Sequence, residues 1–283
     1  MSHFLPKCYL LLAIILNFSL LSCKGFGDRW GEIYAEGGEN TIVVEGTIEA
    51  GRPPKVLLSR SLAVESAPHY HKIADIDTFI VRNAEVYVSD GSRECRLQFA
   101  ADSTSTIGYS YSTTEMIGEA GRTYKLTIFV DEQEITAETT ICANAPQATI
   151  ETELNSDGTY NIVADIQTSE HQPLCFFTRT APDLFYLPAF WGVAIGSGKR
   201  NIYMGESIAS QVDWQLSYNA GDTIDIKIAA IDSVSYNIFY GYARNLSFSR
   251  NFLFPYNYNS PSNLSNGLGY WCGLNACEER VEL

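Results

Sequence analysis

The chain has 283 residues, 46% of them hydrophobic, and its 33 acidic and 19 basic side chains give a formal net charge of −14 at pH 7. This excess of negative charge makes nucleic acid and anionic lipid surfaces poor partners. The length allows one large domain or two of ordinary size, and the 17 Tyr and 14 Phe favour strands over helices.

The first residues have the pattern of an export signal. Lys7 precedes an apolar stretch that is too short and wrongly flanked for a membrane-spanning helix. Leu20 stands three positions before Cys23, as in the lipobox of bacterial lipoproteins. We therefore expect residues 1–22 to be a lipoprotein signal peptide, Cys23 to carry lipid and residues 23–40 to link this anchor to the fold. An ordinary secretory peptide with an incidental cysteine is the alternative.

An N-terminal antiparallel β-sandwich, immunoglobulin-like in kind, is expected over residues 41–144. In 41–51 apolar side chains alternate with polar ones, which is the period of a strand with one wet face. The pair Asp90-Gly91 indicates a hairpin turn within 84–99. Several strands at this spacing, separated by turn residues, are typical of a sandwich.

A second β-rich domain, sandwich-like or barrel-like, is expected over residues 145–283. A proline interrupts the alternation within 142–147, and we place the domain boundary there. The period then changes to that of one amphipathic helix over 233–247, which Asp232 or Ser233 can cap. Apolar side chains recur along this helix at spacing four and are expected to face the sheet: Val234, Ile238, Tyr242 and Leu246.

The stretch 255–273, PYNYNSPSNLSNGLGYWCG, has no period and is rich in Asn and Ser. We expect an ordered coil that packs on the second domain with Trp271 turned inward. Its outward Tyr256 and Tyr258 are then the candidates for ligand contact. Two glycines would permit a positive φ or a close backbone approach: Gly267 and Gly269.

Five cysteines remain once residues 1–22 and the lipid-bearing Cys23 are set aside. An odd number leaves at least one thiol unpaired unless it pairs between molecules. Cys272 and Cys277 are close in sequence. A loop-closing disulfide between them and two free thiols stay open as alternatives.

Motifs for catalysis and for metal binding are lacking. His69 and His71 flank a tyrosine in a proline-marked loop, and the spacing favours solvated histidines over a metal site. The stretch 194–201, AIGSGKRN, lacks the first glycine and the Ser or Thr of a phosphate-binding loop. We can name no nucleophile with a base, and we expect no enzyme, no metal and no cofactor.

Three blocks, residues 41–61, 81–92 and 118–141, resemble in order and spacing the blocks of the Bacteroidota lipoprotein family called domain of unknown function 4249. The segment 254–273 is similar to the closing segment of that family, an Asn-Pro-aromatic stretch that leads into a Gly-Leu-Gly-aromatic motif. The resemblance implies a β-rich outer-membrane lipoprotein in two parts, found beside TonB-dependent importers in nutrient acquisition. It implies no reaction and no catalytic residue.

Two functions follow as expectations. The first is a ligand-binding or accessory lipoprotein beside a TonB-dependent receptor, with a glycan or peptide ligand on the aromatic-rich segments 184–191 and 252–271. The alternative is a structural envelope or interaction module with no soluble ligand. In both, the protein is anchored to the bacterial outer membrane, and its periplasmic or cell-surface face stays open.

Overall fold

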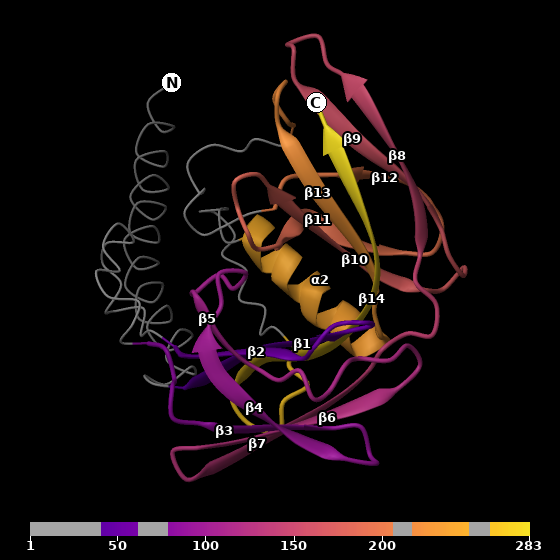
Figure 1. The fold of residues 1–283 in the computed structure, drawn as a ribbon. Coiled ribbons are helices and arrows are strands. Elements are labelled where there is room, and N and C mark those ends of the chain that lie inside the picture. Colours follow the sequence, from indigo (N-terminus) through magenta and orange to yellow (C-terminus); the bar gives the residue numbers. More distant parts are fainter. Residues whose placement is uncertain (1–40, 62–78, 206–216, 249–260) are drawn as a thin grey trace, which may run out of the picture. The chain divides into compact units, whose positions relative to one another are not determined.

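The computed structural model describes four ranges of the chain: residues 41–61, 79–205, 217–248 and 261–283 (Figure 1). Several residues singled out from the sequence lie outside these ranges. They are the expected lipid-bearing Cys23, the candidate ligand contacts Tyr256 and Tyr258, and the loop histidines His69 and His71.

The chain divides into two compact units. Of the smaller unit only Thr41 and Ser61 are described, and Ser61 N–H donates to Thr41 O at 2.8 Å. All other described residues belong to the larger unit, residues 42–60 and 75–283.

The described part of the larger unit consists of strands and a single helix, so the mostly β class expected from the sequence is confirmed. The first seven strands are β1 Ile42–Glu49, β2 Lys55–Arg60, β3 Glu85–Ser89, β4 Glu94–Ala101, β5 Tyr109–Ser112, β6 Thr123–Val130 and β7 Gln133–Thr140. The remaining elements are β8 Gln147–Leu154, β9 Tyr160–Gln167, β10 Pro173–Thr180, β11 Leu187–Ile195, β12 Gly198–Ile202, β13 Thr223–Ala230, α2 Ser233–Phe248 and β14 Leu268–Glu282.

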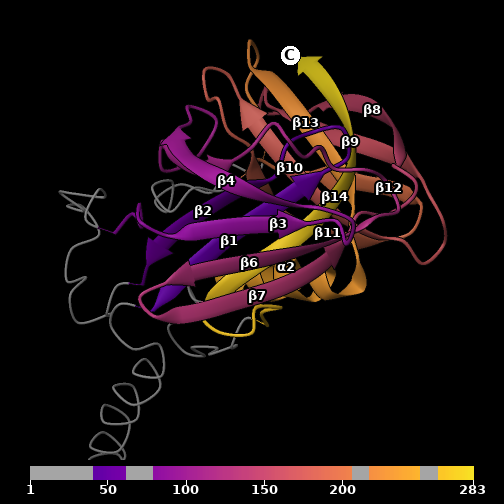
Figure 2. The ribbon, with the colours of Figure 1, turned by 60° about the horizontal axis from the view of Figure 1, so that its bottom comes forward.

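Strands β1 to β7 enclose one hydrophobic core (Figure 2). They follow one another in the order β1-β2-β5-β4-β3-β6-β7 within one sheet. Ile42, Val44 and Ile48 of β1 are buried, as the alternation in the sequence predicts. The far strand β7 comes back against β14, where Gly273 N–H donates to Thr139 Oγ1 at 2.8 Å. The sheet therefore closes around its core.

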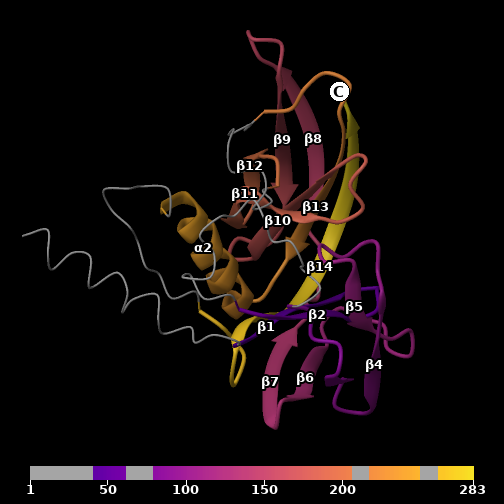
Figure 3. The same ribbon diagram turned by 90° about the vertical axis from the view of Figure 1, so that its left-hand side faces the viewer.

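A second core lies between two sheets. The three-stranded sheet β12-β9-β8 packs against the strands β10, β13 and β14. Ile162 and Ile166 of β9 meet Phe176 of β10 and Ile226 of β13 there, and all four are buried. The opposite face of β10, β13 and β14 is covered by helix α2 (Figure 3).

Helix α2 lies where the sequence predicts it, but its buried face differs. Ser235 N–H donates to Asp232 Oδ1 at 2.7 Å, so Asp232 is the cap. Burial is described for residues 233–243 of the helix, where the buried side chains are Ser235, Ile238, Phe239 and Ala243; the expected Leu246 lies outside these residues. Val234 and Tyr242 are 50% and 39% exposed, and the expected stripe was wrong at both positions. A strict spacing of four drifts by roughly 40° per step around a helix of 3.6 residues per turn, so it cannot stay on one face.

Strand β14 joins the two cores. Residues 268–274 pair in parallel with β1, and residues 275–282 pair antiparallel with β13. One sheet therefore runs from β11 to β7 through β14. The expected boundary at 142–147 falls between β7 and β8, and the division of the chain into two domains stays a prediction.

The position of Trp271 corrects the expected tail. From Leu268 onward the chain is a regular strand and not a coil. Trp271 is fully buried in the core of the first seven strands and not in the second core. Its Nε1–H donates to Tyr124 O at 3.1 Å. The local side-chain bonds expected for this stretch are present, because the amide of Asn263 bonds Trp271 N at 3.0 Å and Trp271 O at 2.7 Å.

The close approach expected at the glycines of this stretch is confirmed. Gly267 and Gly269 have φ values of 88° and 105°. A Cβ on Gly269 would lie 1.9 Å from Val44 O. Glycine is therefore required where β14 meets β1.

Candidate functional site

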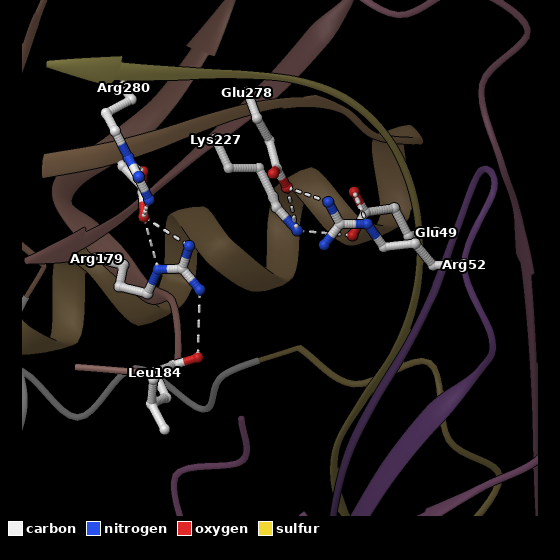
Figure 4. Close-up of polar contacts among 8 residues, drawn as sticks. Glu49, Arg52, Arg179, Leu184, Lys227, Glu278 and Arg280 are labelled. Carbon is white, nitrogen blue, oxygen red and sulfur yellow. Dashed lines mark hydrogen bonds and ion pairs between the residues drawn. The ribbon is translucent and has the colours of Figure 1, made fainter. Parts of the chain in front are cut away.

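The second half of β14 takes part in an ionic network on one face of its sheet (Figure 4). Lys227 of β13 is 6% exposed, and its Nζ lies 2.7 Å from Glu49 Oε2 and 3.1 Å from Glu278 Oε1. Arg52 Nη2 reaches the same Glu278 oxygen at 2.7 Å. Burial acts to raise the pKa of Glu278, but Lys227 and Arg52 outweigh it, and the pKa is lowered. A buried ammonium is thus held by carboxylates from β1 and β14.

A second part of the network centres on Asp225 of β13. Arg280 Nε lies 2.7 Å from Asp225 Oδ1, and Arg179 Nη2 lies 2.6 Å from Oδ2. The hydrogen bond from Arg280 and then that from Arg179 lower the pKa of Asp225 against the effect of burial. Arg179 also donates to Leu184 O at 3.4 Å (Figure 4).

Tyr186 lies between the two parts. The Arg179 guanidinium is 4.7 Å and the Lys227 ammonium 4.6 Å from its ring centroid. Burial and then the charge of Glu278 raise the pKa of Tyr186 to about 12. At neutral pH this phenol is protonated and is a poor base, and the cations around it are paired. The network ties strands together and leaves no unpaired cation for an anionic ligand.

Apart from the ionic network, a groove lies between β14 and β8. Its volume is about 450 Å³, within the range of small ligand sites. The residues that line it are Ala148, Thr149, Ile150, Thr152, Glu279, Arg280, Val281 and Glu282. Figure 3 shows β8 next to this part of β14.

Both walls of the groove are strand edges without a neighbouring strand in the described ranges. β8 is the outer strand of its three-stranded sheet, and beyond Leu274 β14 pairs with β13 alone. Four consecutive residues of β14 line the groove, and β13 pairs with one edge of β14. The groove therefore runs along the other edge of β14, which is free.

The main-chain hydrogen bonds show which backbone groups point outward. Asn155 N–H donates to Thr159 O at 2.8 Å, so odd-numbered residues of β8 bond to β9 and even-numbered ones point outward. On β14, Leu283 N–H donates to Asp222 O at 3.0 Å on the β13 side, and Leu274 O accepts from Ala50 N–H at 2.9 Å on the opposite side. Even-numbered residues beyond Leu274 therefore direct their N–H and C=O groups away from β13.

The aromatic segment 184–191 only partly matches the contact surface expected from the sequence. Tyr186 is half-buried in the ionic network, whereas Leu184 is 53% exposed. Neither is at the groove. The groove was missed because its residues are ordinary alternating strand residues, in ATIETEL and CEERVEL, and only the strand order makes these edges neighbours.

The two cysteines considered as a disulfide, Cys272 and Cys277, are both free. Five steps along an extended strand separate their Cα atoms by roughly 16 Å, and their side chains point to opposite faces. A disulfide needs Cα atoms within about 7 Å, so this fold rules out the bridge. No group of His, Cys, Asp and Glu in the described ranges could hold a metal ion.

In the part of the chain that the structure describes, the protein is mostly β, with stacked sheets and one covering helix. The chain belongs to the family described as a domain of unknown function (DUF4249), whose model matches residues 32–280. No curated protein matches the chain. Among solved structures, a crystal structure of several titin domains matches with 8% identity and a TM-score of 0.21, over 68% of this chain and 60% of that one. No helix in the described ranges is long and apolar enough to cross a membrane.

Proposed function

We propose that this chain is a lipid-anchored protein of the bacterial outer membrane that binds a ligand or partner beside a TonB-dependent importer. The observation that carries the binding role is the groove of about 450 Å³ between the free edges of β8 and β14. The anchor and the importer are supported by the lipobox-like sequence before Cys23 and by membership of the family.

The anchor is tested by Cys23→Ala. This variant should carry no acyl mass and should leave the detergent phase for the aqueous phase, because lipid on Cys23 is its attachment to the membrane. Mass spectrometry and detergent phase separation check both. Unchanged partition and mass would contradict the anchor.

The binding role is tested by photo-crosslinking in native envelopes. A photoreactive residue in place of Thr152, inside the groove, should cross-link to an importer component, whereas one in place of exposed Glu94 on β4 should not. Mass spectrometry identifies the product. Equal labelling from both positions, or none from Thr152, would favour the structural module without a soluble ligand.

A further inference from the structure

We propose that the groove between β8 and β14 takes an extended polypeptide segment rich in Lys or Arg, which adds as a strand to one of the two free edges and packs against the other. This inference rests on the proposed binding role and names the ligand class.

The backbone supplies the first argument. Outward main-chain groups recur at every second residue along β8 and along β14: Ala148, Ile150, Thr152 and Leu154, and Ala276, Glu278, Arg280 and Glu282. Such a row of N–H and C=O groups pairs with an added strand. On β14 it extends over residues 276–282, roughly 23 Å at 3.3 Å per residue, which matches a segment of seven or eight residues.

The side chains supply the second argument. Ile150 and Val281 are half-buried beside the second core and give the groove apolar contacts. Two edges border one groove, so a strand placed there pairs on one side and packs on the other. An isolated strand edge would bind an added strand less tightly, because the far side of the added strand would stay in water.

Charge supplies the third argument. Two carboxylates line the groove, Glu279 and Glu282 of β14, and neither forms an ion pair within 4 Å in the described ranges, although the charge of Glu282 acts on Arg280. Arg280 itself is held by Asp225 at 2.7 Å. The groove therefore presents unpaired carboxylates and no unpaired cation. Opposite charge across an interface raises the association rate and selects the partner, so a cationic segment fits and an acidic one is repelled.

The experiment uses the full chain with Cys23→Ser, which carries no lipid, in a mild detergent, and three acetylated octapeptides. The probe alternates Lys with Val and Thr, the second replaces Lys by Glu, and the third replaces Val by Pro, which lacks an N–H donor. Fluorescence anisotropy should show saturable binding of the Lys peptide and at least about tenfold weaker binding of the other two.

Hydrogen exchange gives the readout that separates strand addition from loose electrostatic attraction. The Lys peptide should slow exchange at alternate amides, those of Ala276, Glu278, Arg280 and Glu282 or those of the matching even-numbered residues of β8. The intervening amides already bond to β13 or β9 and should change little. Uniform protection, or none, would contradict strand addition.

Matched variants locate the site. The pair Glu279→Lys and Glu282→Lys should weaken binding of the Lys peptide at least about tenfold and favour the Glu peptide, whereas Glu94→Lys and Glu134→Lys, with the same change in charge, should not. Thr152→Pro removes an outward N–H without breaking a bond to β9, so it should weaken binding on the β8 edge while leaving the melting temperature nearly unchanged.

Two results would overturn the inference. Equal loss in both charge-reversed pairs would show non-specific attraction, and concentration-dependent dimerisation through the groove would make a second copy the occupant. If Thr152 cross-links to an importer component in envelopes but the Lys peptide does not bind, the binding role stands and the ligand class is wrong. If neither occurs, both are wrong.

Discussion

The indole of Trp271 fills a core built almost wholly by strands that precede it by more than a hundred residues. Its Nε1–H reaches Tyr124 O, and its ring lies so close to Gly46 that a Cβ there would meet the ring at 2.7 Å. The glycine of β1 and the tryptophan of β14 therefore fit as a pair. Any larger residue at position 46 would push the indole out of place.

Trp271→Ala should lower the free energy of unfolding by about 3–5 kcal/mol, because the indole is fully buried and a cavity would remain. Phe129→Ala is the control, since Phe129 is an aromatic of β6 that is 43% exposed. Phe129→Ala should lower the free energy of unfolding clearly less than Trp271→Ala does. Urea unfolding of both variants checks this, and equal losses would contradict the burial of Trp271.

At the scale of elements, the cap of α2 also connects the helix to the first core. Asp232 Oδ1 accepts the N–H of Ser235, while Oδ2 accepts the hydroxyl of Thr139 at 3.0 Å. One carboxylate therefore fixes both the start of the helix and its position against β7. The same Thr139 hydroxyl accepts the N–H of Gly273, which brings β14 into this group.

Asp232→Ala should destabilise the fold by about 0.5–2 kcal/mol through the lost cap, with a further loss from the freed Thr139 hydroxyl. Ser233→Ala should be nearly neutral, because Ser233 is exposed and does not cap. Thermal unfolding followed by circular dichroism measures both. A larger effect at Ser233 would mean that the cap is misassigned.

Elements formed by neighbouring residues could be predicted from the sequence, and those formed at long range could not. The hairpin at Asp90-Gly91 and the helix start at Asp232 depend on local turn and capping chemistry. β14 was missed because its parallel register with β1 depends on a distant strand and not on its own irregular composition. The groove was missed for the same reason. Whether a strand lies at an edge depends on the order of strands in the sheet, and this order is set by contacts between residues far apart in the sequence.

At the scale of the whole molecule, the network around Lys227 ties together strands that are far apart in the sequence. Arg52 and Glu278, 226 positions apart, bond at 2.7 Å. Lys227 lies between Glu49 of β1 and Glu278 of β14. The ammonium neutralises carboxylates that would otherwise repel each other where the two cores meet.

Lys227→Met should destabilise the protein by up to about 3 kcal/mol, because two poorly solvated carboxylates lose their partner. Adding Glu49→Gln and Glu278→Gln should recover much of this loss, since the only charge then left without its partners is that of Arg52, whose side chain is 49% exposed. Arg52→Met, at a side chain that is 49% exposed, should cost at most about 1 kcal/mol. Urea unfolding ranks the variants, and no recovery in the triple variant would contradict the electrostatic cause.

Acid gives a second readout of the same variants. The pKa of Glu278 is lowered in the fold, so its contribution to stability is present above its ordinary value of 4.5 and is lost as the pH falls through the lowered pKa. Lys227→Met should flatten this part of the stability curve. If the free energy of unfolding of Lys227→Met falls between pH 5 and pH 2 with about the same slope as that of the wild type, Lys227 does not hold this carboxylate charged.

The parallel pairing of β1 with β14 also sets an order of events in time. As the chain emerges from its N-terminal end, the first seven strands appear long before Trp271, so their core has an indole-sized vacancy and β1 is paired on one edge only, with β2, until β14 arrives. Such long-range closure makes folding slow and keeps the earlier strands exposed meanwhile. A ribosome stalled between β13 and β14 should therefore present a protease-sensitive chain, and resistance should appear abruptly once β14 is added.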